Sequence, residues 1–591
     1  MDDSILSEIE SLEAGLKKQS ADFSDPVAKL MVTALLHQSA KVRDSIAGLP
    51  DRIAERLCSA FVPVDKVSAC PSLGLVQLTL KARRDIEPHV IADGMSLSYK
   101  LGPRRSLVFH PLYRTLVLPY TAAHLVAPRS VDSGDGHMRA VKGTEGKVWL
   151  GLRMDCEVEC LRNLSFLIKG TGGVLPRRLV AGGGETELSF ASAENMDMMS
   201  VMEPFDSQQM TPRFLEVCAQ WQQVLRGGDG GRLIYVTDPL RDRDMFKRRA
   251  YPKVFQQFLE SRELDGFDND ILWLMFDFGP DYAVPDNIEI LPCVAPVANV
   301  EQGGVMLTQS APIARLDKAD GSFFLTALQP SLAAQRQGFG LNEEEFVIRD
   351  FDTASYDAGR LYRDARNLYN RFIDDYQAFV DYHGLKDGES VKSLRETVNR
   401  IGKSVQGAAD APKAFDEGTY AMRNVNLAGV AAPVKVSYLT TSGALGNTPA
   451  CGQVMENKKD AALEKEARVV CDAAGGRDKA SPDTMHELLR YHLMTADRLY
   501  TRMDIDAFMR MSLLREFGKD EMRRICYDIT VQGVGDTRRL RRGVYIDIRF
   551  KDRKNYEKAR ARNLDTLLHR QIEDKSCLTM PVIVSLINLE E

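Results

Sequence analysis

The periodicity of the apolar residues changes along the chain, and this change limits the folds that the sequence can adopt. Between Pro71 and Phe190 the apolar residues occur in short alternating runs that are bounded by Gly, Pro and Asp. Alternation with a period of two is typical of half-buried strands, and frequent turn residues favour short connections between them. We therefore expect six short strands in an antiparallel sandwich or a barrel-like domain.

Helical spacing replaces this alternation on both sides of the β-rich part. In the first 62 residues apolar side chains recur at intervals of three and four, and Asp25-Pro26 gives a typical helix start. The same spacing returns between residues 356 and 405, with a break at Gly384 to Gly388. These intervals predict helices at the N-terminus and a pair of long helices later in the chain.

The C-terminal part mixes both periods. We expect a polar loop over 443–481, helices over 483–517 with a break near 502–504, two strands, and a helix over 555–572. The final strand, over 578–589, is apolar at almost every position, which is typical of a central strand that is buried on both faces.

Together these patterns predict an α+β, multidomain fold. The expected regions are N-terminal helices over 1–62, an antiparallel β-rich domain over 63–200, an α/β or α+β domain over 201–350, long bundle helices with a linker over 351–420, and a C-terminal α+β domain with a β-β-α-β ending over 421–591.

The charge balance argues against a dedicated nucleic-acid binder. The chain has 77 Lys and Arg against 83 Asp and Glu, a net charge of −6, and so offers no positive field to a polyanion. Its acidic start lacks the pattern of a secretory signal, and no apolar run approaches the ~20 residues of a membrane-spanning helix. Ten scattered cysteines are typical of reduced thiols in an intracellular protein. We expect a soluble protein without membrane insertion.

Catalytic and metal-binding motifs fail the test of spacing. His486-Glu487 begins like the helical zinc signature, but Arg490 takes the place of the second histidine, so a charge-paired helix surface is expected instead. The glycine-rich segments near 143–148, 170–173 and 182–184 are expected to be turns. Cys156 and Cys160 are expected on one strand face as core thiols. We therefore predict no catalytic residues, no metal and no cofactor.

Apolar rows on the two long helices are the best candidates for a partner interface. Such a row can hold two helices of one chain together or join subunits, and spacing does not separate these alternatives. An arginine-rich turn is a second candidate, because arginine is favoured at protein interfaces. The seam residues are Leu361, Ala365, Leu368, Phe372, Phe379, Val391, Leu394, Val398 and Ile401, and the basic residues are Arg538, Arg539, Arg541 and Arg542.

Several segments occur in an order that is characteristic of one protein family. An Asp-Pro helix start is followed by Pro71-Ser72 and then by Val76-Gln77 in a strand. Later come HPLYRTLVLPYTA, RMDCEVECLRNLSFLIKG, AYPKVFQQFL, NIEILPCVAPVANV with Cys293, Pro296, Val297 and Asn299, and RRGVYIDIRF. Over most of the chain this order resembles TssF, a baseplate subunit of the bacterial type VI secretion system.

The sequence also departs from that family. The segment ADRLYTRMDIDAFMRMSLLREFG looks instead like the helical segment of phage baseplate-J-like wedge proteins. The resemblance therefore suggests a divergent, Bacteroidetes-type member, related to the wedge proteins of contractile phage tails.

The resemblance implies a structural role without catalysis. Two copies of TssF would join one TssG in a baseplate wedge that links TssK, TssE and the contractile sheath. Such a wedge would be cytoplasmic and would dock at the inner membrane through its partners. A phage-tail baseplate wedge protein is the alternative, followed by an unrecognised hydrolase that uses Asp and Glu pairs.

Overall fold

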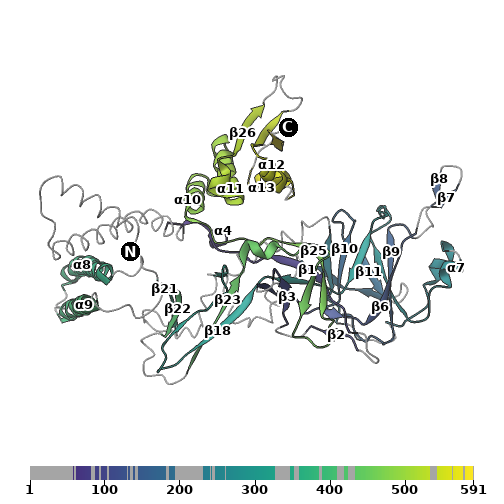
Figure 1. Cartoon of the computed structure of the whole chain (residues 1–591), viewed down its shortest axis with the longest axis horizontal. Coiled ribbons are helices and arrows are strands. Elements are labelled where there is room, and N and C mark those ends of the chain that lie inside the picture. Colours follow the sequence, from purple (N-terminus) through teal and green to yellow (C-terminus); the bar gives the residue numbers. More distant parts are fainter. Residues whose placement is uncertain are drawn as a thin grey trace, which may run out of the picture. The chain divides into compact units, whose positions relative to one another are not determined.

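The computed structural model contains two compact units, and each is assembled from separate stretches of chain (Figure 1). Unit 1 takes Met1–Val67, Thr353–Ala411 and Ala480–Glu591, and unit 2 takes Ser68–Asp352 and Pro412–Lys479. The predicted α+β, multidomain fold is confirmed. The structure describes residues 57–58, 61–81, 87–91, 95–102, 105–128, 131–133, 137–139, 144–181, 186–193, 231–239, 241, 246–259, 261–325, 346–351, 358–384, 389–408, 418–423, 433–532, 542–561, 564–576 and 580–589.

Six strands of unit 2 form a closed barrel. Three of them, over Leu73–Gln77, Leu97–Lys100 and Ser106–Pro111, lie in the predicted β-rich segment, whereas the other three come from residues 294–298 and 454–474, which local alternation did not assign to it. Every neighbouring pair in the barrel is antiparallel. The strand over Val294–Ala298 is buried at all its positions, because Ala295 and Val297 pack in the main core of unit 2 while Val294 and Ala298 pack in a second core on its other face. In barrel order the strands are β1 (Leu73–Gln77), β17 (Val294–Ala298), β4 (Ser106–Pro111), β3 (Leu97–Lys100), β24 (Val454–Asn457) and β25 (Glu466–Ala474).

The polar loop expected over 443–481 is wrong, because this segment supplies two of the barrel strands. In β25, Ala467 and Val469 point into the core, while Glu466 and Arg468 between them are exposed. Outward charges on a half-buried strand lower the mean hydropathy of the segment, so its composition is similar to that of a polar loop.

Two further antiparallel sheets share the main core of unit 2 with the barrel. The ring of Phe166 meets that of Phe276 edge to face at 5.2 Å and joins the two sheets. One sheet has the order β12 (Thr186–Leu188), β11 (Arg178–Ala181), β15 (Ile271–Asp277), β9 (Lys147–Met154) and β6 (Tyr120–Val126), and the other β13 (Phe190–Ser192), β14 (Arg232–Val236), β10 (Ser165–Lys169) and β16 (Glu289–Pro292).

Smaller elements connect these sheets. The strand β9 ends at Met154, so Cys156 and Cys160 lie beyond it as half-buried free thiols, and the prediction that they share a strand face is wrong. Gly170, Gly172 and Gly173 adopt positive φ in the turn after β10, as expected. The remaining short elements are β2 (His89–Val90), β5 (Leu116–Val117), β7 (Val131–Ser133), β8 (His137–Arg139), η3 (Lys253–Gln257), α7 (Ser261–Leu264) and η5 (Gly443–Asn447).

Two three-stranded sheets in unit 2 share a separate core. Tyr438 lies across Gly303 of the paired strand, where a Cβ atom would come within 2.3 Å of the ring. The hydroxyl of Tyr438 also donates to the carbonyl of Asp317 at 2.8 Å, so the glycine allows the ring to reach this loop. The sheets are β18 (Glu301–Leu307), β23 (Val434–Thr441) and β20 (Phe323–Phe324), and β19 (Ile313–Arg315), β22 (Gly418–Arg423) and β21 (Phe346–Phe351).

Two helices of unit 1 begin at typical capping residues. Ser481 caps α10 and is followed by proline, and Thr501 forms a capping box with Asp504 at the start of α11. Ala496 and Asp497 adopt left-handed conformations in the break between them, which lies over 496–501 and so precedes the break expected near 502–504. The helices are α4 (Val64–Val67), α8 (Ala358–His383), α9 (Glu389–Ala408), α10 (Pro482–Thr495), α11 (Arg502–Met522), α12 (Arg553–Ala561) and α13 (Leu564–Lys575).

The C-terminal sheet has the expected elements but not the expected order. Its strands are β26 (Ile525–Gln532), β27 (Gly543–Phe550) and β28 (Val582–Asn588), with β27 in the centre. The prediction that the last strand is central is therefore wrong, because β28 lies at the sheet edge, parallel to β27. The single helix expected over 555–572 is also wrong, because α12 and α13 are two helices.

Several predictions fall outside the described residues. These are the helices before residue 57, the glycine-rich turn at 182–184 and most of the linker after the long helices.

A partly buried network joins the end of α10 to the end of α13. The carboxylate of Asp497 accepts hydrogen bonds from the hydroxyl of Tyr491, at 2.8 Å, and from Lys575. Partial burial favours the protonated carboxyl, but the hydrogen bonds from Lys575 and Tyr491 outweigh it, and the pKa of Asp497 is lowered.

Asp497→Asn should lower the thermal midpoint of unit 1 at neutral pH by about 3–8 °C, because an amide loses the charge-assisted bonds. Asparagine tolerates the left-handed backbone as aspartate does, so strain does not contribute. A lowered pKa gives stability that is complete above the unfolded value of about 3.9 and is lost as pH falls through the folded value. In calorimetry, the difference in thermal midpoint between the wild type and the variant should therefore disappear as the pH falls below about 4. A difference that does not change with pH would contradict this account.

Candidate interaction surfaces

The long helices α8 and α9 pack side by side as a hairpin (Figure 1). Val380 of α8 and Val398 of α9 are buried, at 8% and 9% exposure. Ala365, Tyr369 and other side chains on the same side of α8 are half-buried. One part of the predicted seam therefore holds the hairpin itself together.

A second row of large apolar side chains on α8 is exposed. Leu368, Phe372, Phe379 and Tyr382 keep 70%, 49%, 51% and 86% of their surfaces accessible. At 100° per residue these four positions fall within about 80° of the helix circumference, next to the side that faces α9. We call them the exposed row. Single exposed apolar side chains scattered over a surface are normal, whereas several aligned in one contiguous patch mark an interaction surface.

The structure thus divides the predicted seam. Val398 lies inside the hairpin, Leu368, Phe372 and Phe379 lie in the exposed row, and Ile401 of α9 is 36% exposed. Ala365, Val391 and Leu394 are half-buried, and Leu361 belongs to α8 although its side chain is outside the described residues. Sequence spacing missed Tyr382, the most exposed member of the row. A role of these residues in binding a partner stays a prediction.

The arginine-rich turn is only partly described. Arg542 is exposed directly before β27, whereas Arg538, Arg539 and Arg541 lie outside the described residues.

The helix that resembles a zinc signature has a charge-paired surface, as predicted. Glu487 pairs with Arg510 of α11 at 3.0 Å and with Arg490 at 4.0 Å. His486 is exposed and contacts the carbonyl of Pro482, whereas His492 is buried on another side of the helix. Among the described residues no group of three or more His, Cys, Asp or Glu side chains could hold a metal ion.

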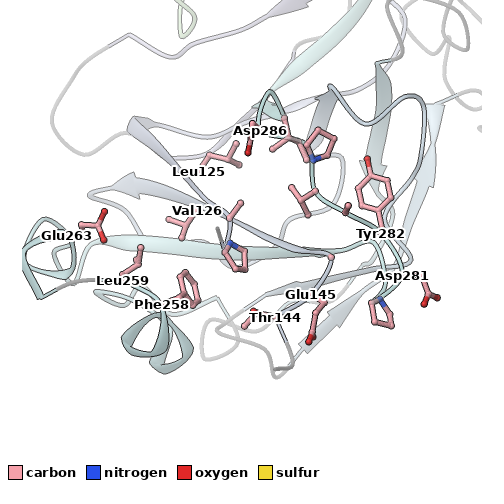
Figure 2. Close-up of a pocket in the computed structure, with 18 of the residues that line it drawn as sticks. Leu125, Val126, Thr144, Glu145, Phe258, Leu259, Glu263, Asp281, Tyr282 and Asp286 are labelled. Atoms are coloured by element: carbon pink, nitrogen blue, oxygen red, sulfur yellow. The ribbon is translucent and has the colours of Figure 1, made fainter. Parts of the chain in front are cut away.

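Unit 2 also contains a concavity that no sequence pattern predicted (Figure 2). It has a volume of about 1160 Å³, and its lining comes from four separate segments, so no local signal could have found it. The lining combines apolar side chains, among them Leu125 and Phe258, with the carboxylates of Glu145, Glu263, Asp281 and Asp286. No histidine, cysteine, lysine or arginine is among these lining residues.

Three of the segments that carry the family resemblance, around residues 76–77, 110–122 and 287–300, meet beside the barrel strand β1. The side-chain amide of Gln77 donates to the hydroxyl of Tyr120 at 3.0 Å and to the carbonyl of Pro292 at 3.2 Å. The next residue, Cys293, is fully buried and accepts a bond from the amide of Leu118. Burial raises the pKa of this thiol to about 12, so it stays protonated at neutral pH and is a packing group rather than a nucleophile.

Asn299 extends this contact region at the end of β17, with 2% of its surface exposed. Its side-chain amide donates to the carbonyl of Val108 at 2.9 Å, and its oxygen accepts from the amide of Ser442 at 2.8 Å and the hydroxyl of Thr441 at 3.2 Å. Its own backbone amide donates to Ser72 at 2.9 Å. One buried side chain therefore ties β4 to the end of β23.

No helix among the described residues combines the length and the apolar character that a membrane crossing requires.

Chains of three solved structures resemble this structure at low sequence identity. One is a chain of the type VI secretion system TssK-TssF-TssG baseplate subcomplex, with 12% identity, coverage of 95% of this chain and 96% of that chain, and a TM-score of 0.38. Another belongs to the baseplate complex of the type VI secretion system, with 12% identity, 98% and 94% coverage, and a TM-score of 0.32. A chain of the anti-feeding prophage baseplate matches over 30% of this chain and 38% of its own, with 12% identity and a TM-score of 0.14. No protein-family model and no curated protein matches the sequence.

Asn299→Ala should weaken the barrel by about 3 kcal/mol, because it leaves the carbonyl of Val108 and the amide of Ser442 without this partner in a buried site. Native-state hydrogen exchange of β17 should then become about 100-fold faster. Gln302→Ala, at an exposed position on β18, is the matched control and should change exchange by less than threefold. Equal exchange in both variants would contradict the role of Asn299.

Val398→Asp should open the hairpin, because it places a carboxylate at a buried contact between α8 and α9, at a cost of about 2 kcal/mol or more. Leu368→Asp should leave the hairpin intact, since Leu368 is 70% exposed. Limited proteolysis of the full chain should cut α8 and α9 faster in the first variant only. Equal cleavage of both variants would show that the buried and exposed rows are wrongly assigned.

Proposed function

We propose that this chain is a structural subunit of a type VI secretion baseplate wedge, of the TssF class. In this proposal it is a scaffold rather than an enzyme, and it assembles with TssG and a second copy of itself. Two copies would join one TssG, and the wedge would link TssK, TssE and the contractile sheath. It would act in the cytoplasm, docked at the inner membrane through its partners.

The exposed row on α8 is the observation that carries this proposal. Burying large apolar side chains is worth ~25 cal/mol per Å², so leaving Leu368, Phe372, Phe379 and Tyr382 in water is costly unless a partner covers them. The row is narrow and straight, which suits a second helix better than a small ligand. A helical bundle formed with other subunits would cover it.

The positions of the resembling segments agree with a shared scaffold. Gln77, Cys293 and Asn299 bond the barrel to neighbouring segments of unit 2. This part of the resemblance to TssF therefore rests on residues that maintain the fold. The surfaces that contact partners can differ between family members while such a core stays the same. This is what we expect of a divergent member of the TssF family.

Leu368→Asp combined with Phe372→Asp should abolish co-purification with a TssG-class subunit co-expressed from the same organism. Both side chains are exposed, so the substitutions place charge in the interface without disturbing the hairpin. The expected loss of bound partner is at least 100-fold, since two desolvated apolar contacts become buried charges.

Asn367→Asp combined with Asn370→Asp is the matched control. These exposed residues lie on the polar side of the same helix, and the change adds the same charge at similar spacing. This control should retain the partner. Retention of the partner by the Leu368 and Phe372 variant, with normal helical content, would contradict the proposed bundle.

A further inference from the structure

The last strand combines a sequence suited to the middle of a sheet with a position at its edge. The strand β28 reads Val-Ile-Val-Ser-Leu-Ile-Asn and carries no ionisable side chain and no proline. Proteins usually protect edge strands with charges, prolines or bulges, because an unpaired strand edge binds other strands. Ile583 remains 37% exposed, and Leu589 directly after the strand is 52% exposed.

The hydrogen-bond pattern of β28 shows which backbone groups point outward. The carbonyl of Pro581 accepts from Val544, and the amide of Leu589 donates to Phe550, so the odd-numbered residues between them bond to β27. Backbone groups alternate in direction along a parallel ladder. The amides and carbonyls of Val584 and Leu586 therefore point away from the sheet.

This outer edge is complementary to itself. In an antiparallel pairing centred on Ser585, Val584 of one strand lies opposite Leu586 of the other, and both present outward backbone groups. Each such pair exchanges two hydrogen bonds. On the opposite face of the sheet from Val584 and Leu586, Ile583 of one strand then lies beside Ile587 of the other. The two Ser585 side chains meet on this same face. The pairing places no like charges opposite each other, which would be destabilising.

We propose that β28 pairs with β28 of a second copy of this chain, antiparallel and centred on Ser585. Two three-stranded sheets thereby join into one six-stranded sheet through an interface with twofold symmetry. The occupant is a second copy because the uncharged edge satisfies its own backbone groups, and this register brings the two small Ser585 side chains together at the twofold axis. This contact is separate from the exposed row of α8 and does not depend on the proposed function.

Cross-linking of the full chain tests the register directly. In the proposed pairing the two Ser585 residues form a non-hydrogen-bonded pair with Cα atoms about 4.5 Å apart, which is within the range of a disulfide. Ser585→Cys should give a disulfide-linked dimer under mild oxidation, with the linked peptide identified by mass spectrometry. Ile583→Cys, on the same strand face, should not link to itself, because its copy lies about 13 Å away along the strand.

Charge substitution tests the same contact without cysteine chemistry. Ser585→Lys and Ser585→Glu should each sediment as monomers, because like charges then meet at the twofold axis, whereas an equal mixture should restore the dimer. Ser585→Thr should remain dimeric, and circular dichroism should show that all variants are folded. A monomeric wild-type chain, self-linking equal at residues 583 and 585, or a strand of another protein linked to Ser585→Cys would each overturn the proposal.

Discussion

Closure of the six-stranded barrel is the constraint on which the rest of unit 2 depends. The strand β17 is buried on all sides, and Asn299 at its end bonds to β4 and to the end of β23. An amide side chain with 2% exposure must keep these bonds, since an unpaired buried polar group is costly. The chain must therefore bring residues near 75, 295 and 470 together before the barrel is stable.

The same constraint explains which features the sequence could predict. Local periodicity predicted the strands after Pro71, the hairpin of α8 and α9, and the capped helices α10 and α11, because each depends on neighbouring residues. The contribution of β24 and β25 to the barrel depends on pairing with β1 and β3 across several hundred residues. Periodicity carries no information about such pairing, and alternating charges made this segment look like a loop.

The sequence predicts where apolar side chains line up on an element. It does not predict whether such a row is exposed or buried in the folded chain. The spacing placed Leu368 and Val398 in one seam, whereas the structure exposes the first and buries the second. An apolar run likewise suggested that β28 is a central strand, although it is an edge strand in the single chain. In both places the sequence is more apolar than the position in an isolated subunit requires, which is expected of a protein that functions in an assembly.

Hydroxyl-radical footprinting of α8 tests the central claim most directly, because it reports the solvent exposure of individual leucine, phenylalanine and tyrosine side chains. The chain alone should be compared with the complex purified through an affinity tag on the proposed TssG-class partner. The account predicts that labelling of Leu368, Phe372, Phe379 and Tyr382 falls severalfold in the complex, while labelling of exposed Tyr500 on the C-terminal part stays the same. Equal labelling of the exposed row in both samples would contradict the claim that this row is the surface through which the scaffold assembles.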